Sequence, residues 1–276
     1  PLEEEVMTPY DFIRREKINY WNSVPSIVGF MKKMGYLSKG AFPSIEYSMF
    51  CGEQLPKHCA DAWRIAAPNS TIENLYGPTE ATIYTSRYLY SNSKEKELFC
   101  NNIIPIGEAF PTMTIEIINE SSDMENSGEI GEIVYKGPQV TQGYLNDESK
   151  TKSVFVQFDW DKSGDIWYKS GDLGFLNKSG DFECIGRKDN QIKLGGRRIE
   201  IGEIESVLSK FTLLQDVVVV PIKDESRITI GCVAYTMSEI NKEEKMRIRQ
   251  ERMQHLEKVF FPKKIVTIDE FPRSLS

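Results

Sequence analysis

The sequence predicts an α/β protein in which a mostly parallel sheet is followed by a β-rich subdomain and then by a small α+β domain. Three observations predict this order. Strand and helix signals alternate over residues 18–77, strand signals dominate residues 82–188, and a mixed pattern returns from Asp189. Strands that alternate with helices through short links form parallel sheets with right-handed crossovers. With 276 residues, 40% of them hydrophobic, the chain can form one large and one small domain, which we expect at 1–188 and 189–276.

The alternation in the first third begins with a short apolar strand at 18–23. Ser23 is expected to be the N-cap of the helix that follows, because Pro25 then falls in its first turn. The elements expected in order are a helix at 25–37, a strand at 44–52, a helix at 56–66 and a strand at 71–77.

Two of these strands end in polar turns. The segments are FCGE, residues 50–53, and YGPTE, residues 76–80. Because ligands of parallel sheets bind beyond the carboxyl ends of the strands, the sequence predicts a small-molecule site at these two ends. A plain turn would need the Gly and Pro of YGPTE but not its adjacent hydroxyl and carboxylate.

The remainder of the chain predicts strands and hairpins. Hairpin turns are expected at DKSGD (161–165) and NKSGD (177–181). Beyond Asp189 a hairpin leads into a helix that begins near Gly202. The last expected elements are paired strands at 216–222 and 227–237, a charged, solvated helix at 242–259 and a final strand at 263–271.

Composition excludes several classes of function. A net charge of −7 argues against nucleic-acid binding, and no apolar run approaches the length of a membrane span. Five scattered cysteines without a C-x-x-C pair indicate reduced thiols in a cytoplasmic protein. With only His58 and His255, a histidine metal site or a Ser-His-Asp triad is excluded.

Taken singly, the candidate functional residues each allow two interpretations. Asp172 and Asp181 both follow Ser-Gly, but apolar residues flank only Asp172, which suits the two hydroxyls of a ribose. Arg187 and Lys193 suit phosphate or carboxylate contacts, or simply form the charged face of a hairpin. Cys51 is interpreted as a small pocket residue rather than a nucleophile, because no nearby His could activate it.

Four segments in order resemble the adenylate-forming (AMP-binding) enzymes. They are most similar to the amino-acid adenylation domains of nonribosomal peptide synthetases and to D-alanine–carrier protein ligases, and the match runs over nearly the whole chain. The segments are NLYGPTE (74–80), GEIVYKGPQVTQGYLND (131–147), WYKSGDLG (167–174) and GRKDNQIKLGGRRIEIGEIE (186–205). The resemblance implies that the chain is the C-terminal part of the adenylating core followed by the small mobile domain.

This resemblance implies a two-step reaction. ATP and an amino acid give an aminoacyl-adenylate, and a phosphopantetheine thiol of a carrier protein then takes the aminoacyl group. It implies ATP or AMP and Mg²⁺ as cofactors. The nucleotide would contact Tyr76 (adenine stacking), Gly77, Asn74 (the exocyclic amine), Gly52 and Glu53 (backbone), Thr79 (phosphate), Asp172 (ribose hydroxyls) and Arg187 (ribose and phosphate).

The resemblance also assigns catalysis, specificity and movement. Thr79, Glu80 and Lys193 would be catalytic, with Glu80 binding Mg²⁺. Asp189 would be the hinge, and residues 194–200 would line the entry of the carrier thiol. The acyl pocket would be formed by Asn22, Met49, Cys51, Leu75, Ile83 and Tyr84, and MFCGEQLP (49–56) is similar to ligases that activate D-alanine, a small substrate.

The chain also departs from the family pattern. The phosphate loop and the aspartate that pairs with the substrate amine are expected before residue 1, and the terminal Gly-Lys after FPRSLS. Cys184 stands where many relatives carry an aromatic residue. We therefore expect residues 1–276 alone to be inactive, to expose a sheet edge and to need the missing N-terminal portion. The alternatives are a non-catalytic scaffold that binds a carrier protein or the missing half, and an acyl- or aryl-CoA ligase.

Overall fold

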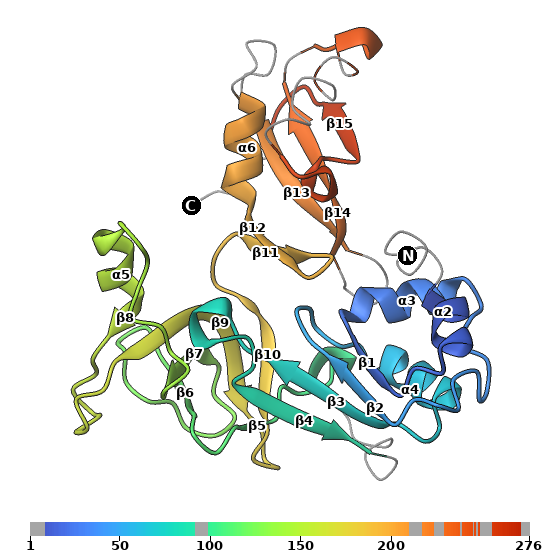
Figure 1. Cartoon of the computed structure of the whole chain (residues 1–276). Helices are drawn as coiled ribbons and strands as arrows, with labels where there is room; N and C mark the ends of the chain where they lie inside the picture. Colours follow the sequence, from blue (N-terminus) through green and yellow to red (C-terminus); the bar gives the residue numbers. More distant parts are fainter. Residues whose placement is uncertain are drawn as a thin grey trace. The chain divides into compact units, whose positions relative to one another are not determined.

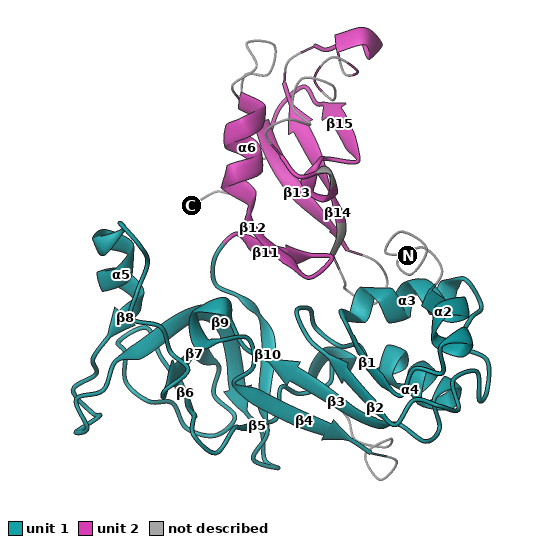
Figure 2. Cartoon of the chain, viewed as in Figure 1, with its two compact units in different colours: residues 1–189 teal, residues 190–276 magenta. Residues whose placement is uncertain are grey.

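The structure is a computed structural model that describes residues 9–91, 99–209, 217–223, 229–237, 239–244, 246, 248 and 256–271. The chain separates into two compact units, residues 1–189 and residues 190–276 (Figure 2). The boundary expected from sequence lies one residue earlier. Within the described residues, none of the helices has the length and apolar content that crossing a bilayer requires.

The first sheet of unit 1 confirms the predicted alternation (Figure 1). Its strand order is β1-β2-β3-β4-β5, and β1, β2 and β3 run parallel whereas β4 and β5 are antiparallel to their neighbours. The strands are β1 (Tyr20–Ser23), β2 (Tyr47–Phe50), β3 (Thr71–Tyr76), β4 (Ser86–Tyr90) and β5 (Glu108–Ala109). The helices are α2 (Pro9–Arg15), α3 (Pro25–Lys33) and α4 (Lys57–Ala66). One apolar core joins helices and strands, with Trp63 of α4 against Phe50 of β2.

The expected N-cap of α3 is wrong. The N-cap position is Val24, and the Ser23 hydroxyl instead accepts a hydrogen bond from Trp21 Nε1 at 2.9 Å. The backbone amide of Ser26, in the first turn, donates to Glu53 Oε2 at 3.0 Å. The carboxylate of a residue remote in sequence therefore caps the N-terminus of α3. The helix also ends at Lys33, four residues before the expected end, since Gly35 takes a positive φ of 77°.

The second sheet of unit 1 is antiparallel, with the order β10-β9-β7-β6, and β8 pairs with β9. Its strands are β6 (Thr114–Ile118), β7 (Gly131–Lys136), β8 (Phe155–Val156), β9 (Trp167–Leu176) and β10 (Phe182–Arg187), and α5 (Glu148–Val154) precedes β8. The short 3-10 turns η1 (Thr79–Ala81) and η3 (Cys100–Asn102) lie in unit 1 as well. Both expected turns connect antiparallel strands: 161–165 lies between β8 and β9, and 177–181 joins β9 to β10.

Unit 2 is the small α+β module that the sequence predicts. It contains β11 (Gln191–Leu194), β12 (Arg197–Glu200), α6 (Ile201–Ser209), β13 (Val217–Lys223), β14 (Thr229–Thr236), η4 (Lys258–Phe260) and β15 (Lys264–Thr267). The expected pairing of the valine-rich strand with the next one is confirmed, since β13 and β14 are antiparallel. Half of the expected helix at 242–259 lies outside the described residues.

Candidate active site

The YGPTE segment leaves β3 and returns at once beside it. The amide of Thr85 donates to the carbonyl of Tyr76 at 2.8 Å, so the chain closes on itself. A Cβ on Gly77 would lie 2.5 Å from the Ile83 carbonyl oxygen, which is why a glycine stands there. Thr82 and Ile83 have φ of 56° and 71°, a conformation that β-branched residues rarely adopt and that the surrounding bonds must hold. The tip of β3 is thus a tightly constrained loop.

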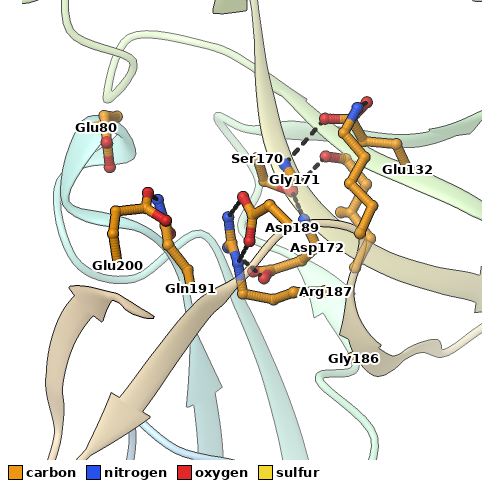
Figure 3. Close-up of polar contacts among 12 residues, drawn as sticks. Glu80, Glu132, Ser170, Gly171, Asp172, Gly186, Arg187, Asp189, Gln191 and Glu200 are labelled. Carbon is orange, nitrogen blue, oxygen red and sulfur yellow. Dashed lines mark hydrogen bonds and ion pairs between the residues drawn. The ribbon is translucent and has the colours of Figure 1, made fainter. Parts of the chain in front are cut away.

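A chain of polar contacts begins at Tyr76, at this tip. Figure 3 shows its continuation from Asp172 through Arg187 to Asp189. The Tyr76 hydroxyl donates to Asp172 Oδ2, and Arg187 Nη1 donates to Asp172 Oδ1 at 2.6 Å. Arg187 also donates from Nε to Asp189 Oδ1 at 2.6 Å and from Nη2 to Asp189 Oδ2. These four residues, all named from the sequence, therefore form one connected cluster.

Burial and neighbouring charges together shift the pKa values of Tyr76 and Arg187. Burial, and then the negative charge of Asp172, raise the pKa of the Tyr76 phenol well above its usual value, so Tyr76 stays a hydrogen-bond donor. Burial alone would lower the pKa of Arg187, but the hydrogen bonds and charges of Asp189 and Asp172 outweigh it and raise that pKa. Asp172 is 4% exposed. A buried carboxylate between a phenol and a guanidinium presents acceptor oxygens in a fixed place.

Hydrogen bonds fix the two residues that precede Asp172 on β9. Ser170 Oγ donates to the Ile133 carbonyl at 2.6 Å and accepts from the Asp172 amide at 3.0 Å. The Gly171 amide donates to Glu132 Oε1 at 2.9 Å, and Lys188 Nζ donates to the other oxygen of Glu132 (Figure 3). Sequence reasoning did not select Ser170 or Glu132 as functional residues, although both lie in the quoted motifs.

Glu80 lies on the η1 turn and is 6% exposed, whereas Thr79 beside it is exposed. Glu80 Oε1 accepts a hydrogen bond from the Tyr144 hydroxyl at 2.6 Å. Tyr144 was likewise not selected from sequence. The sequence marks Tyr144 only as part of the GEIVYKGPQVTQGYLND motif.

Asn74 is buried on β3, two residues before Tyr76. Its Nδ2 donates to the carbonyls of Ile104, at 3.2 Å, and Pro105, at 2.8 Å. Both N–H bonds are therefore used, and the oxygen is the atom that Asn74 can offer to an amine. Gly52, with φ of 87°, and Glu53, whose carboxylate caps α3, follow β2 at the same edge of the sheet.

The structure brings only some of the expected acyl-pocket residues close to one another. Asn22 and Met49 are register partners on β1 and β2, and Asn22 Nδ2 donates to the Tyr84 hydroxyl at 3.1 Å. Cys51 is half-buried just beyond β2 and Leu75 is 4% exposed on β3. Ile83, by contrast, is 58% exposed on the returning loop. Asn22 and Tyr84 are therefore in contact, and Met49 neighbours Asn22 on the adjacent strand.

Lys193 belongs to unit 2. It lies on β11 opposite Arg198 of β12 and is half-buried. The two strands are joined by Gly195 and Gly196, with φ of 59° and 75°, which is the pattern of a two-residue hairpin turn. This turn requires the two glycines whatever else the segment does.

Comparison with known proteins identifies relatives of this chain. The model of the family described as AMP-binding enzyme matches residues 2–145. The D-alanine–D-alanyl carrier protein ligase of Listeria welshimeri is 31% identical over 272 residues, which cover 97% of this chain and 52% of that protein. The Delta-poly-L-ornithine synthetase of Acinetobacter baumannii is 29% identical over 96% of this chain and 19% of its own length.

Solved structures match as well. The Vibrio cholerae adenylation domain AlmE, in complex with glycyl-adenosine-5′-phosphate, is 31% identical with a TM-score of 0.88 over 99% of this chain and 51% of that chain. This chain spans about half the length of both proteins, 51% of the AlmE chain and 52% of the Listeria welshimeri ligase. The family match covers more than half of the residues, and the chain therefore belongs to the AMP-binding enzyme family.

Proposed function

We propose that the protein containing this chain activates an amino acid with ATP as the aminoacyl-adenylate and passes it to the phosphopantetheine thiol of a carrier protein. The observation that carries the proposal is the cluster of Tyr76, Asp172 and Arg187 beside the YGPTE turn, at the carboxyl ends of parallel strands. Such ends are where nucleotides bind in parallel sheets. The carrier protein ligases among the relatives support the same reaction.

In this proposal the buried cluster holds the nucleoside. Tyr76 stacks on adenine, and the Asn74 oxygen accepts a hydrogen bond from the exocyclic amine. Because Asn74 Nδ2 already donates to two backbone carbonyls, the oxygen is the atom of this amide that can face the nucleotide. Asp172 accepts from the ribose hydroxyls, and Arg187 lies beside the ribose and phosphate. The backbone at Gly52, Glu53 and Gly77 completes the adenine pocket.

The residues of the turn fit Mg²⁺ together with a phosphate. Within the described residues, no three His, Cys, Asp or Glu side chains gather as a metal-binding group. Mg²⁺ commonly binds through one or two carboxylates plus substrate phosphates, and Glu80 offers one such carboxylate. Mg²⁺ bound there would supply the positive charge that offsets the charge of departing pyrophosphate. Thr79 would donate its hydroxyl to a phosphate oxygen.

The acyl pocket is proposed to take a small amino acid. Asn22 and Tyr84 are joined by a hydrogen bond, and Met49 is the register partner of Asn22 on β2, which supports a shared pocket for these three residues. Cys51, Leu75 and Ile83 are the further residues assigned to this pocket. AlmE, 31% identical, was solved with a glycyl-adenylate, which supports a small substrate such as glycine or D-alanine.

Unit 2 is proposed to move about Asp189 between the two half-reactions and to bring Lys193 into catalysis. The division of the chain into compact units at Asp189 and Asn190 supports a hinge there. The turn at 194–200 would face the carrier thiol. The inactivity of residues 1–276 alone stays a prediction.

The test is ATP–pyrophosphate exchange with the complete protein and a panel of acids, followed by carrier loading. Exchange stimulated by glycine or D-alanine, and not by fatty or aromatic acids, is the expected result. Exchange with no acid in the panel would overturn the proposal in favour of a non-catalytic scaffold. Exchange with fatty or aryl acids, and transfer to coenzyme A, would instead identify an acyl- or aryl-CoA ligase.

A further inference from the structure

The segment that follows β7, residues 137–144, packs along the YGPTE turn and is given no role in the proposed reaction. Five hydrogen bonds join it to residues 80–84, and four of them are at most 3.0 Å long. The Thr141 amide donates to the Glu80 carbonyl at 2.8 Å, and Thr82 Oγ1 donates to the Gln139 carbonyl at 2.8 Å. Gln139 Nε2 donates to the Tyr84 carbonyl at 3.0 Å, and the Tyr144 hydroxyl donates to Glu80 Oε1 at 2.6 Å. We call residues 137–144 the supporting loop.

The Tyr144 side chain is itself held in place. Its ring packs edge-on against Phe155 with centroids 5.7 Å apart, and Lys150 Nζ lies 4.9 Å from the ring centroid. Its backbone amide donates to Thr151 Oγ1 at 2.9 Å. Gly143, with φ of 143°, lets the chain pass this threonine, since a Cβ there would lie 2.5 Å from Thr151 Cγ2. The phenol is therefore a fixed donor and not a mobile surface group.

The contact with Glu80 has a definite consequence. A carboxylate that is nearly buried can rotate about its last bond, and one short O–H···O bond to one oxygen restricts that rotation. The remaining lone pairs then point in a constant direction. Groups that hydrogen-bond a metal-ligating side chain in this way orient it and tune its affinity.

We propose that Tyr144 is a positioning residue that orients the Glu80 carboxylate for a divalent cation shared with the nucleotide phosphates. This rests on the proposed function, because it takes Glu80 as the metal-binding residue. Loss of the phenol oxygen should weaken Mg²⁺ binding about tenfold, the lower end of what such partners contribute. It should leave the binding of metal-free ATP unchanged.

The experiment is a calorimetric titration of ATP into the complete protein at a series of Mg²⁺ concentrations and without Mg²⁺. Tyr144→Phe is compared with Tyr90→Phe, a matched control that also removes a phenol donor to a carboxylate, Asp61. Tyr90 is the register partner of Ile72, four residues along β3 from Tyr76. The expected result is a tenfold higher Mg²⁺ requirement for Tyr144→Phe and no change for Tyr90→Phe.

A double-mutant cycle with Glu80→Gln isolates the pair. In the Glu80→Gln protein, Tyr144→Phe should have no further effect on the Mg²⁺ requirement. In pyrophosphate-exchange assays, Tyr144→Phe should raise the Mg²⁺ concentration that gives half-maximal rate. The maximal rate at saturating Mg²⁺ should stay within about twofold of that of the unaltered protein. A purely structural role for Tyr144 would instead weaken metal-free ATP binding and lower the melting temperature, which would overturn the inference.

The outcomes separate the two proposals. If Glu80→Gln raises the Mg²⁺ requirement and Tyr144→Phe does not, the positioning role is wrong and the proposed function stands. If the unaltered protein shows no Mg²⁺-dependent ATP binding, both are wrong.

Discussion

The tetrapeptide Lys-Ser-Gly-Asp occurs three times between residues 162 and 181, at 162–165, 169–172 and 178–181. The first and third copies form exposed turns beside β9, and the middle copy lies within β9 itself. In all three the glycine has a positive φ, of 74°, 74° and 86°. Identical residues with similar glycine conformations thus serve different purposes.

The third copy is held by local bonds, whereas the first is also contacted by Lys136 of β7, which donates to Ser163 Oγ at 3.2 Å. Asn177 Oδ1 accepts from the amides of Ser179 and Asp181, at 2.9 and 3.0 Å. A Cβ on Gly164 or Gly180 would meet nothing within 4 Å. These glycines are needed for the turn conformation alone.

The middle copy is held by distant residues. Ser170 bonds to Ile133, Gly171 to Glu132, and Asp172 to Tyr76 and Arg187. A Cβ on Gly171 would lie 2.6 Å from Arg187 Nη2 and 2.9 Å from Asp189 Oδ2. The difference shows that burial between β7 and β10, and not the tetrapeptide, turns an aspartate into a candidate ligand for a ribose.

The largest expected difference is between Asp172→Asn and Asp181→Asn. Asp172→Asn removes the charge that Arg187 pairs with and one of the two acceptor oxygens that the proposed function assigns to the ribose hydroxyls. ATP affinity, measured by calorimetry on the complete protein, should fall about 100-fold, the equivalent of losing one charged hydrogen bond. Asp181→Asn should change it less than about twofold, as for a surface substitution. Equal effects of the two changes would show that burial does not distinguish Asp172 from Asp181 in nucleotide binding.

A smaller difference is expected between Ser170→Ala and Ser179→Ala. Ser170→Ala leaves the Ile133 carbonyl and the Asp172 amide without a buried partner, so the free energy of unfolding should fall by about 2 kcal/mol. Ser179 is exposed, and its change should stay within about 0.5 kcal/mol. Denaturant unfolding of both variants measures this. A Ser170→Ala protein as stable as the unaltered one would show that water replaces the hydroxyl.

The smallest difference is expected between Gly171→Ala and Gly180→Ala. Both place a side chain at positive φ, at a cost of about 1–2 kcal/mol. Gly171→Ala must also displace the ends of Arg187 and Asp189, which should add about 1 kcal/mol through a weakened charged hydrogen bond. The two unfolding midpoints, taken under the same conditions, test this. If Gly180→Ala were the more damaging change, the ion pair beside Gly171 would contribute nothing.

Several features could be predicted from the sequence because their signals are local. The alternation of strands and helices gave the parallel order of β1, β2 and β3, and the Asn-Lys-Ser-Gly-Asp turn gave the β9–β10 hairpin. Asp172 could be separated from Asp181 because apolar residues flank only Asp172. Others could not be predicted, since Glu53 caps α3 from 27 residues away and Tyr144 reaches Glu80 across 64.

The sequence by itself therefore determined the order of the elements, the family resemblance and the residue types available for nucleotide chemistry, because periodicity and motif spacing are properties of neighbouring residues. Only the tertiary structure decided which oxygen accepts from which donor. Tyr76, Asp172 and Arg187 lie up to 111 residues apart, and their contact exists because two sheets bring the tip of β3 against β9 and β10. Burial there strengthens each hydrogen bond, and it makes an unpaired charge so costly that each charge must have a partner.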